Sequence, residues 1–368
     1  MKKVLHIISG GETGGSRKHV TTLLEQYPRD SVTLLVFQEG ALSQEAREKG
    51  IHVELLQQKS RYDLSILKRL AAFIREGNYE IVHSHGPRAN LFISLIKKQM
   101  DAVWVTTIHS DPKLDFMKGG LKGRVFTALN LHAMKKIDVF FAVSERFKEN
   151  LAALGIPAER IHTIYNGIEF IEPIEPNGDL QKELHLNDQD FVMTMVARMH
   201  PIKGHDIVLK AMKQINDPSI HLVLVGDGPI KEEVISMAKE LGLSGNVHFL
   251  GFRKDIEQIY SNSHIALLAS HSESFPLALL EGANQKLPLI STDVGGVKQL
   301  IPSEEYGWVV PVNDPNAYAE AITSAHKEFN QGTLSSKGER LYEFARTNFS
   351  LKSLADSIEK TYDQIAKK

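Results

Sequence analysis

Short apolar runs alternate with helical segments along most of the chain. β-branched and aliphatic residues cluster in runs that predict buried strands at residues 4–9, 32–37, 52–56, 81–84, 103–108, 139–143 and 161–164. Between the runs, apolar residues recur at helical spacing, as at Leu64, Leu67 and Leu70. Strands that alternate with helices require crossover connections, so the pattern predicts a parallel sheet covered on both faces.

The pattern stops at residues 168–178, where Pro173, Pro176 and Gly178 interrupt it, and we predict an interdomain linker there. It restarts with strands expected at residues 191–197, 220–225, 247–250, 264–269, 289–291 and 308–310. The expected fold is therefore α/β, with two Rossmann-like parallel-sheet domains that face a central cleft. We expect residues 1–170, completed by a C-terminal helix at 350–368, to form the first domain, and residues 171–349 to form the second.

Composition agrees with this architecture. A chain of 368 residues suits two domains, and 42% hydrophobic with 24% charged residues excludes a largely disordered or fibrous protein. The absence of cysteine excludes disulfides, thiolate metal sites and a cysteine nucleophile, and it leads us to expect a cytoplasmic protein. The apolar run after Lys2 and Lys3 is short and contains His6, so we expect an opening strand rather than a signal peptide.

The formal net charge of −2 gives no general attraction to nucleic acid or to an anionic membrane, and we expect no nucleic-acid partner. The segment from Lys113 to Lys136 is locally basic and contains interleaved apolar residues such as Phe116 and Phe126. It is consistent with a basic amphipathic helix that contacts the inner face of a membrane. The alternative is a core-facing helix with a solvated rim.

A glycine-rich loop follows the first strand. Gly10, Gly11, Gly14 and Gly15 would let backbone amides approach an anion at the start of a helix, which we expect near Arg17. The loop matches neither the dinucleotide fingerprint nor the P-loop. A plain tight turn is the alternative.

A second loop, after the strand at residues 191–197, carries Arg198 and Lys203. Two cations at a strand end can clamp a diphosphate and neutralise the charge that develops as it leaves. The alternative is a pair of solvated surface cations.

A third loop carries Glu273 and leads into a helix that contains Glu281, with Pro276 expected in its first turn. The free amides of that turn suit phosphate, and the two carboxylates suit sugar and ribose hydroxyls. The alternative is a capping role for Glu273 and an ordinary polar-face position for Glu281.

Taken together, these loops resemble the large retaining glycosyltransferase family 4 of the GT-B superfamily over nearly the whole chain. The matching motifs are the loop at residues 10–15, Thr107-Ile108-His109, Asn166-Gly167-Ile168, Arg198 with Lys203-Gly204, Gly226-Asp227-Gly228-Pro229, Gly251-Phe252, the Glu273/Glu281 pair and Asp293-Val294-Gly295-Gly296.

The resemblance implies a donor site made of Gly14, Gly15, Arg198, Lys203, Phe252, Arg253, Glu273, Ser274, Phe275, Leu277, Ala278 and Glu281. In this picture Arg198 and Lys203 hold the diphosphate, while Glu281 binds the ribose. Glu273 binds a hydroxyl of the transferred sugar, and the base is held at Phe252 or Arg253. The catalytic group would comprise His109, beside the reacting carbon, together with Glu273, Arg198 and Lys203.

The implied reaction is transfer of a hexose-type sugar, with retention, from a nucleoside diphosphate. UDP is the expected nucleotide and GDP the alternative. The acceptor is an unknown sugar, lipid-linked molecule or small molecule, in glycan, glycolipid or cell-envelope polysaccharide synthesis. The two cations with a helix N-terminus already supply positive charge, so we expect no metal and no cofactor.

Three other functions fit parts of the sequence. His83, His85 and His109 resemble the beginning of a metal-hydrolase site, although no carboxylate ligand is organised with them. A sugar-nucleotide epimerase would share the architecture and the donor. A non-catalytic sugar-nucleotide-binding protein is the third alternative.

Overall fold

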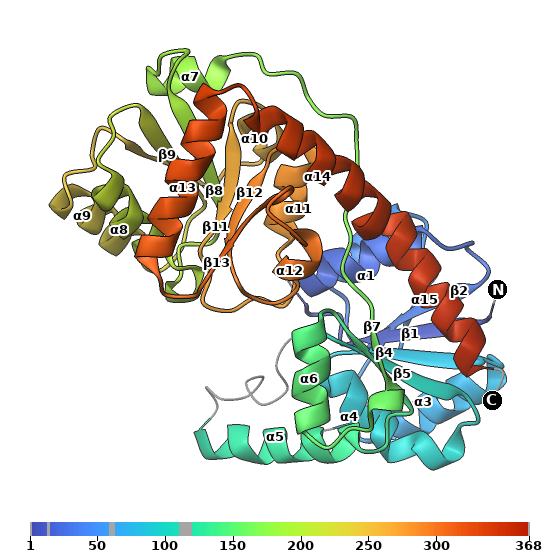
Figure 1. Cartoon of the computed structure of the whole chain (residues 1–368). Coiled ribbons are helices and arrows are strands. Elements are labelled where there is room, and N and C mark those ends of the chain that lie inside the picture. Colours follow the sequence, from blue (N-terminus) through green and yellow to red (C-terminus); the bar gives the residue numbers. More distant parts are fainter. Residues whose placement is uncertain (1, 13–14, 59–62, 110–119, 367–368) are drawn as a thin grey trace. The chain divides into compact units, whose positions relative to one another are not determined.

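The structure is a computed structural model that describes residues 2–12, 15–58, 63–109 and 120–366. The chain divides into two compact units, the first made of Met1–Asn166 with Leu351–Lys368 and the second of Gly167–Ser350 (Figure 1). The first unit thus takes both ends of the chain, and the second is one continuous segment.

The first unit contains a seven-stranded sheet of order β3-β2-β1-β4-β5-β6-β7. All its strand pairs are parallel. Its elements are β1 (Val4–Ile8), α1 (Gly15–Glu25), β2 (Val32–Val36), α2 (Ala41–Glu48), β3 (Val53–Leu55), α3 (Ser65–Glu76), β4 (Ile81–His85), α4 (Pro87–Ile96), β5 (Val103–Ile108), α5 (Gly120–Met134), β6 (Val139–Ala142), α6 (Glu145–Ala153), β7 (Ile161–Thr163) and α15 (Leu351–Ile365).

Two hydrophobic cores lie on the two faces of this sheet. One face is covered by α3, α4, α5 and α6, and the other by α1, α2 and α15. The strands are apolar on both sides because both faces are buried. The apolar stripe of α15, including Leu354 and Ile358, packs beside α1 on the second face.

The second unit contains a six-stranded sheet of order β10-β9-β8-β11-β12-β13, again parallel throughout. Its elements are α7 (Asp179–Leu184), β8 (Phe191–Val196), α8 (His205–Ile215), β9 (Ile220–Val225), α9 (Lys231–Glu240), β10 (Val247–Gly251), α10 (Ile256–Ser261), β11 (Ile265–Leu268), α11 (Leu277–Asn284), β12 (Leu289–Thr292), α12 (Val297–Leu300), β13 (Gly307–Val310), α13 (Pro315–Asn330) and α14 (Leu334–Phe349).

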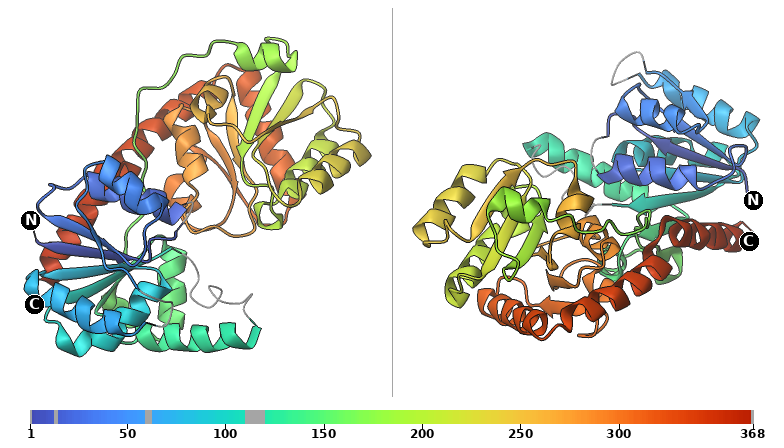
Figure 2. Two further views of the ribbon diagram at one scale, coloured as in Figure 1. Left: turned by 180° about the vertical axis from the view of Figure 1, so that it is seen from behind. Right: turned by 90° about the horizontal axis from the view of Figure 1, so that it is seen from above.

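Successive side chains of β8 point to opposite faces of the sheet and pack into two different hydrophobic cores. Phe191, Met193 and Met195 face the larger core, under α8, α9 and α13. Val192 faces the other side, where α7 and α10 pack. The views in Figure 2 show helices on both faces of each sheet.

The predicted α/β fold with two parallel sheets is confirmed, and the observed strands lie within a residue or two of the predicted runs. Two details differ from the expectation. Helix α1 begins at Gly15 rather than near Arg17, and α7 forms at Asp179–Leu184, for which no helix is predicted above. Among the described residues, no helix is long and apolar enough to cross a membrane.

Candidate functional site

The second unit has a topological switch point between β8 and β11. These strands are neighbours in the sheet, but their connections run to opposite sides of it, and ligands of such sheets bind in the crevice outside the carboxyl ends of the two strands. The loop after β8 carries Arg198 and Lys203, and the loop after β11 carries Glu273. Three predicted site residues therefore lie at the edge where topology favours a ligand.

Lys203 and Glu273 meet across the two loops. The Nζ of Lys203 lies 2.5 Å from Oε1 of Glu273, and the Ser270 hydroxyl donates to the same oxygen at 2.6 Å. The side chains are 25% and 14% exposed, so solvent reaches both. The pair places a cation and a carboxylate side by side at the switch point.

Glycine makes this approach of the two loops possible. Lys203 ends a short 3₁₀ turn (Pro201–Lys203), and Gly204 follows it with φ of 64°. A Cβ at Gly204 would overlap the carbonyl oxygen of Ala269, the residue that follows β11. The amide of His271 also donates to the carbonyl of Ile202 at 2.8 Å. These contacts hold the two loops together.

Arg198 is exposed at the same edge. The next residue, Met199, is buried, and its amide donates to the carbonyl of Asp227 at 3.0 Å. Gly228 must be small because a Cβ there would overlap the carbonyl of Met199. The motif at residues 226–229 thus supports the backbone next to Arg198.

The helix that follows Glu273 begins one residue later than predicted. Pro276 is extended, with φ −82° and ψ 95°, and precedes the first turn, which starts at Leu277. The expectation that Pro276 lies inside that turn is therefore wrong, because its ψ is not helical. Leu277 and Ala278 form the start of α11, and Glu281 lies further along the same helix, half-buried.

Ser274 and Phe275 contribute differently from the other predicted donor residues. Phe275 is buried, and its ring lies 5.4 Å from that of Phe349. Gly296 packs against the Phe275 ring, and Gly295 (φ 52°) lies against the carbonyl of Ser274. The side chain of Phe275 is therefore part of the core, and Phe275 offers only its backbone at this point.

Phe252 and Arg253 follow β10, one of the two edge strands of the sheet. Phe252 is 72% exposed. Arg253 is held by Asp255 at 2.6 Å and by Glu183 at 3.0 Å, and these carboxylates raise its pKa. The guanidinium is already engaged, which leaves the backbone of Arg253 and the ring of Phe252 as the groups suited to a base.

In the first unit, the switch point lies between β1 and β4. The glycine-rich loop is there, and the Glu12 carboxylate accepts from the amides of Ser9 at 3.1 Å and Gly10 at 2.7 Å. The loop therefore binds a carboxylate of its own chain, which the sequence reasoning had missed. Gly14 lies outside the described residues, and Gly15 begins α1.

Five histidines gather at this edge of the first unit. His83 and His85 lie on β4, His6 on β1 and His19 on α1, and all four are buried. His109 follows β5, and its Nε2 is enclosed. The sequence reasoning found His83, His85 and His109 but missed His6 and His19. The alternation of Val4, His6 and Ile8 is the signal for His6, but it is informative only once β1 is known to pair with β4.

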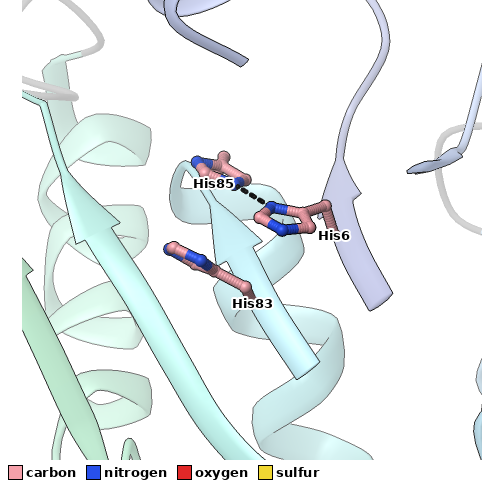
Figure 3. A group of neighbouring side chains, drawn as sticks. All are labelled: His6, His83 and His85. Carbon is pink, nitrogen blue, oxygen red and sulfur yellow. Dashed lines mark hydrogen bonds between the residues drawn. The ribbon is translucent and has the colours of Figure 1, made fainter. Parts of the chain in front are cut away.

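Burial keeps these imidazoles neutral. It lowers the pKa of His6 to about 3 and that of His19 to about 4. The pKa values of His83, His85 and His109 also lie well below the ordinary range, first because of burial and then because of neighbouring imidazoles. His6, His83 and His85 bring nitrogens within 4.8 Å of one another (Figure 3).

The basic segment is described only in part. Residues 113–119 lie outside the described residues. Helix α5 begins at Gly120, and its exposed side carries Val125, Phe126 and Leu129. Lys136, just after the helix, donates to the carbonyl of Ser94 at 3.0 Å.

Comparison with known proteins agrees with this architecture. Residues 13–170 match the family described as "Glycosyltransferase Family 4", and residues 177–344 match "Glycosyl transferases group 1". The structure is similar to that of Anabaena HepE in complex with UDP, with a TM-score of 0.85, 20% identity, and coverage of 98% of this chain and 100% of that one.

Curated relatives carry similar names. The chain is 26% identical over 314 residues to N-acetyl-alpha-D-glucosaminyl L-malate synthase of Bacillus anthracis, which covers 82% of this chain and 79% of the relative. It is 27% identical over 270 residues to UDP-Gal:alpha-D-GlcNAc-diphosphoundecaprenol alpha-1,3-galactosyltransferase of Escherichia coli, which covers 71% and 70% of the two chains.

Two parallel-sheet units in this order, together with these matches, define a GT-B glycosyltransferase. The chain belongs to the group 1 glycosyltransferases. This membership supports transfer over the epimerase and binding-only alternatives.

Proposed function

We propose that this enzyme transfers a hexose-type sugar from a UDP-sugar to an acceptor, with retention at the anomeric carbon, and that the second unit holds the donor. The observation that carries the proposal is the Lys203–Glu273 pair at the switch point of that unit. A diphosphate that binds Lys203 would replace Glu273 as its anionic partner. The freed carboxylate oxygen then suits a hydroxyl of the transferred sugar.

The charge around this pair suits a leaving diphosphate. Arg198 lies exposed on the same loop as Lys203, and α11 begins with Leu277 and Ala278 immediately after the Glu273 loop. Cations and a helix N-terminus stabilise the negative charge that grows on the leaving group. We propose that this arrangement makes a metal ion unnecessary.

The remaining donor contacts follow from the same edge. Glu281 on α11 suits the ribose hydroxyls, and the exposed ring of Phe252 with the backbone of Arg253 suits the base. UDP is the preferred nucleotide because the similar structures of HepE include complexes with UDP and with UDP-glucose. His109, a neutral imidazole, would lie beside the reacting carbon.

The first unit would then bind the acceptor, which we place in glycan, glycolipid or cell-envelope polysaccharide synthesis. The E. coli relative is named for a diphosphoundecaprenol acceptor. A contact of the segment 113–136 with the inner face of a membrane would suit such an acceptor, and the exposed Val125 and Leu129 support it. Sedimentation with anionic lipid vesicles tests this contact, and protein that stays in the supernatant at low salt would contradict it.

Calorimetric titration with UDP tests the donor assignment. We expect Lys203→Ala and Arg198→Ala each to weaken UDP binding about 10- to 100-fold, because each removes a charged hydrogen bond to phosphate. Lys210→Ala is the matched control, because Lys210 also pairs with a carboxylate, Asp206 at 2.8 Å, but on the exposed side of α8. Parent-like affinity in both site variants would refute the clamp.

Glu273→Ala separates the two roles within the pair. It should reduce turnover of the sugar donor much more than it reduces affinity for UDP alone, since Glu273 is assigned to the sugar. Glu240→Ala is its control, because Glu240 likewise accepts from a serine hydroxyl, that of Ser236 at 2.9 Å on α9. Equal losses of UDP affinity and turnover would place Glu273 at the nucleotide instead.

A further inference from the structure

One face of the sheet in the first unit changes from aliphatic to imidazole along its strands. β1 presents Val4 and then His6 on the face under α1 and α15, and β4 presents Ile81 and then His83 in register with them. His85 follows two residues after His83 and therefore lies on the same face. On β5, Thr107 is paired with His85. The polar end of this face is the carboxyl edge of the sheet, where the predicted site residues of the first unit lie.

Three of the imidazoles form a column that runs toward the edge. The rings of His83 and His85 stack at 4.4 Å between centroids with 22° between planes. The ring of His85 in turn lies 5.9 Å from that of His109, at 26°. At the outer end, His19 meets His109 edge-on at 4.7 Å. The orientation of His109 is thus bounded by two other imidazoles.

The inner end of the column is fixed by hydrogen bonds to both ring nitrogens of His83. The Tyr362 hydroxyl lies 2.5 Å from Nδ1, and Thr107 Oγ1 lies 2.7 Å from Nε2. Burial raises the pKa of Tyr362 well above its ordinary value, so the phenol keeps its proton. With the phenol as donor to Nδ1, the His83 Nε2–H donates to Thr107, which selects one tautomer and one ring orientation.

The same contacts favour a hydrogen-bonded network over a metal site. Nδ1 of His6 and Nε2 of His85 are 3.0 Å apart, with 14° between the ring planes (Figure 3). Nearly coplanar rings whose nitrogens face each other suit an N–H···N bond, whereas a metal needs lone pairs that converge on one point. A metal at His83 would also have to displace Tyr362 or Thr107.

We infer that Tyr362 is a positioning residue for His109. From the C-terminal helix α15, its hydroxyl fixes His83, which supports His109 in two ways. The ring of His85 stacks on that of His83 and also faces that of His109, so a fixed His83 ring restrains the ring of His109. The bond to Thr107 holds β5 two residues before His109 on the same strand face. The inference rests on the proposed place of His109 beside the transferred sugar.

Tyr362→Phe tests this role against a matched control. Tyr27→Phe also removes a buried phenol hydroxyl that bonds to α15, at 3.4 Å from the carbonyl oxygen of Ala355, but Tyr27 does not belong to the imidazole column. Two quantities are measured: the long-range ¹H–¹⁵N spectra of the histidine side chains in the free enzyme, and kcat and KM for the sugar donor.

We expect Tyr362→Phe to shift the ring signals of His83, His85 and His109 and to lower kcat about 10-fold, with UDP affinity within about 2-fold of the parent, because orientation rather than donor binding is lost. Tyr27→Phe should match the parent in both measurements. Thr107→Val should act as Tyr362→Phe does, and Thr107→Ser, which keeps the hydroxyl, should restore the parent spectrum. The Thr107 pair also serves if Tyr362→Phe does not fold.

Three results would overturn the inference: a Tyr362→Phe enzyme with the spectrum of Tyr27→Phe, shifted spectra with unchanged kcat, or about one equivalent of bound metal in the purified protein. The outcome is separable from that of the proposed function. Failure of the donor assignment would appear in the UDP titrations of the Lys203 and Arg198 variants, which do not depend on the imidazole column.

Discussion

Gly204 connects the charged pair of the candidate site to the fold. Its positive φ turns the chain from the Lys203 loop into α8, and its lack of a side chain lets the loop lie against the carbonyl of Ala269. Since Glu273 follows Ala269 on the next loop, the geometry of the Lys203–Glu273 pair depends in part on this contact.

Gly204→Ala should therefore destabilise the second unit by about 2–4 kcal/mol, because it combines a left-handed conformation with an overlap. Gly332→Ala isolates the first cost, since Gly332 has a similar φ of 70° and open space around it. That control should lose only about 1 kcal/mol. Urea unfolding measures both, and equal losses in the two variants would show that the contact with Ala269 is unimportant.

The residues of the second unit were the easier ones to predict from the sequence. Arg198, Lys203 and Glu273 lie in the loops that follow two apolar runs, so their place at the carboxyl edge of a sheet required only the strand assignment. The pairing of Lys203 with Glu273 was not predicted, since the sequence does not say that β8 and β11 are neighbours. For Arg253, the ion pair with Glu183 depends on a helix, α7, that had no clear signal.

At the scale of elements, strand positions were predicted well and strand order was not. Buried strands identify themselves by their apolar runs, but the order β2-β1-β4-β5 arises from crossover connections that leave no local pattern. His6 and His83 are far apart in the sequence and become partners only through that order. For the same reason the contact between Tyr362 and His83 could not be predicted from the sequence.

The imidazole layer, made of His6, His19, His83, His85 and His109, should make the first unit less stable in mild acid. Its histidines have lowered pKa values when folded and about 6.5 when unfolded, so above pH 6.5 both states are neutral and stability is fully present. As pH falls below 6.5, the unfolded chain takes up protons that the folded layer excludes. Each such histidine then lowers the unfolding free energy by about 1.4 kcal/mol per pH unit, until the folded pKa of about 4 for His19 is reached.

Urea unfolding between pH 7.0 and 5.5 tests this sensitivity, because carboxylates titrate mainly below that window. His19→Gln removes one member of the layer and should make the dependence shallower by about one histidine's share. Identical slopes in the parent and His19→Gln would contradict the prediction.

At the scale of the whole molecule, one unit is made of a single continuous segment of the chain and the other is made of two segments. The second unit is continuous from Gly167 to Ser350, whereas the first needs the last helix, α15, to complete its core. Ile168 donates its amide to the carbonyl of Phe349 at 3.1 Å, so the second unit closes its own ends just before α15 begins. The chain can therefore lose α15 without cutting through the second sheet.

Removing residues 351–368 should consequently unfold the first unit and spare the second. The truncation exposes the core residues that α15 covers on the first sheet and removes Leu354, Ile358 and Tyr362 from it. Hydrogen exchange, measured on individual peptides, shows the result: β1, β4 and β5 should lose protection, while β8, β9 and β11 keep it.

Ile358→Ala is the milder companion variant and should lower the unfolding free energy of the first unit by about 2–5 kcal/mol. UDP binding should survive the truncation, because every donor contact proposed for Arg198, Lys203 and Glu281 lies within the second unit. Loss of protection in both units, or in neither, would show that the cooperative boundaries differ from the two compact units.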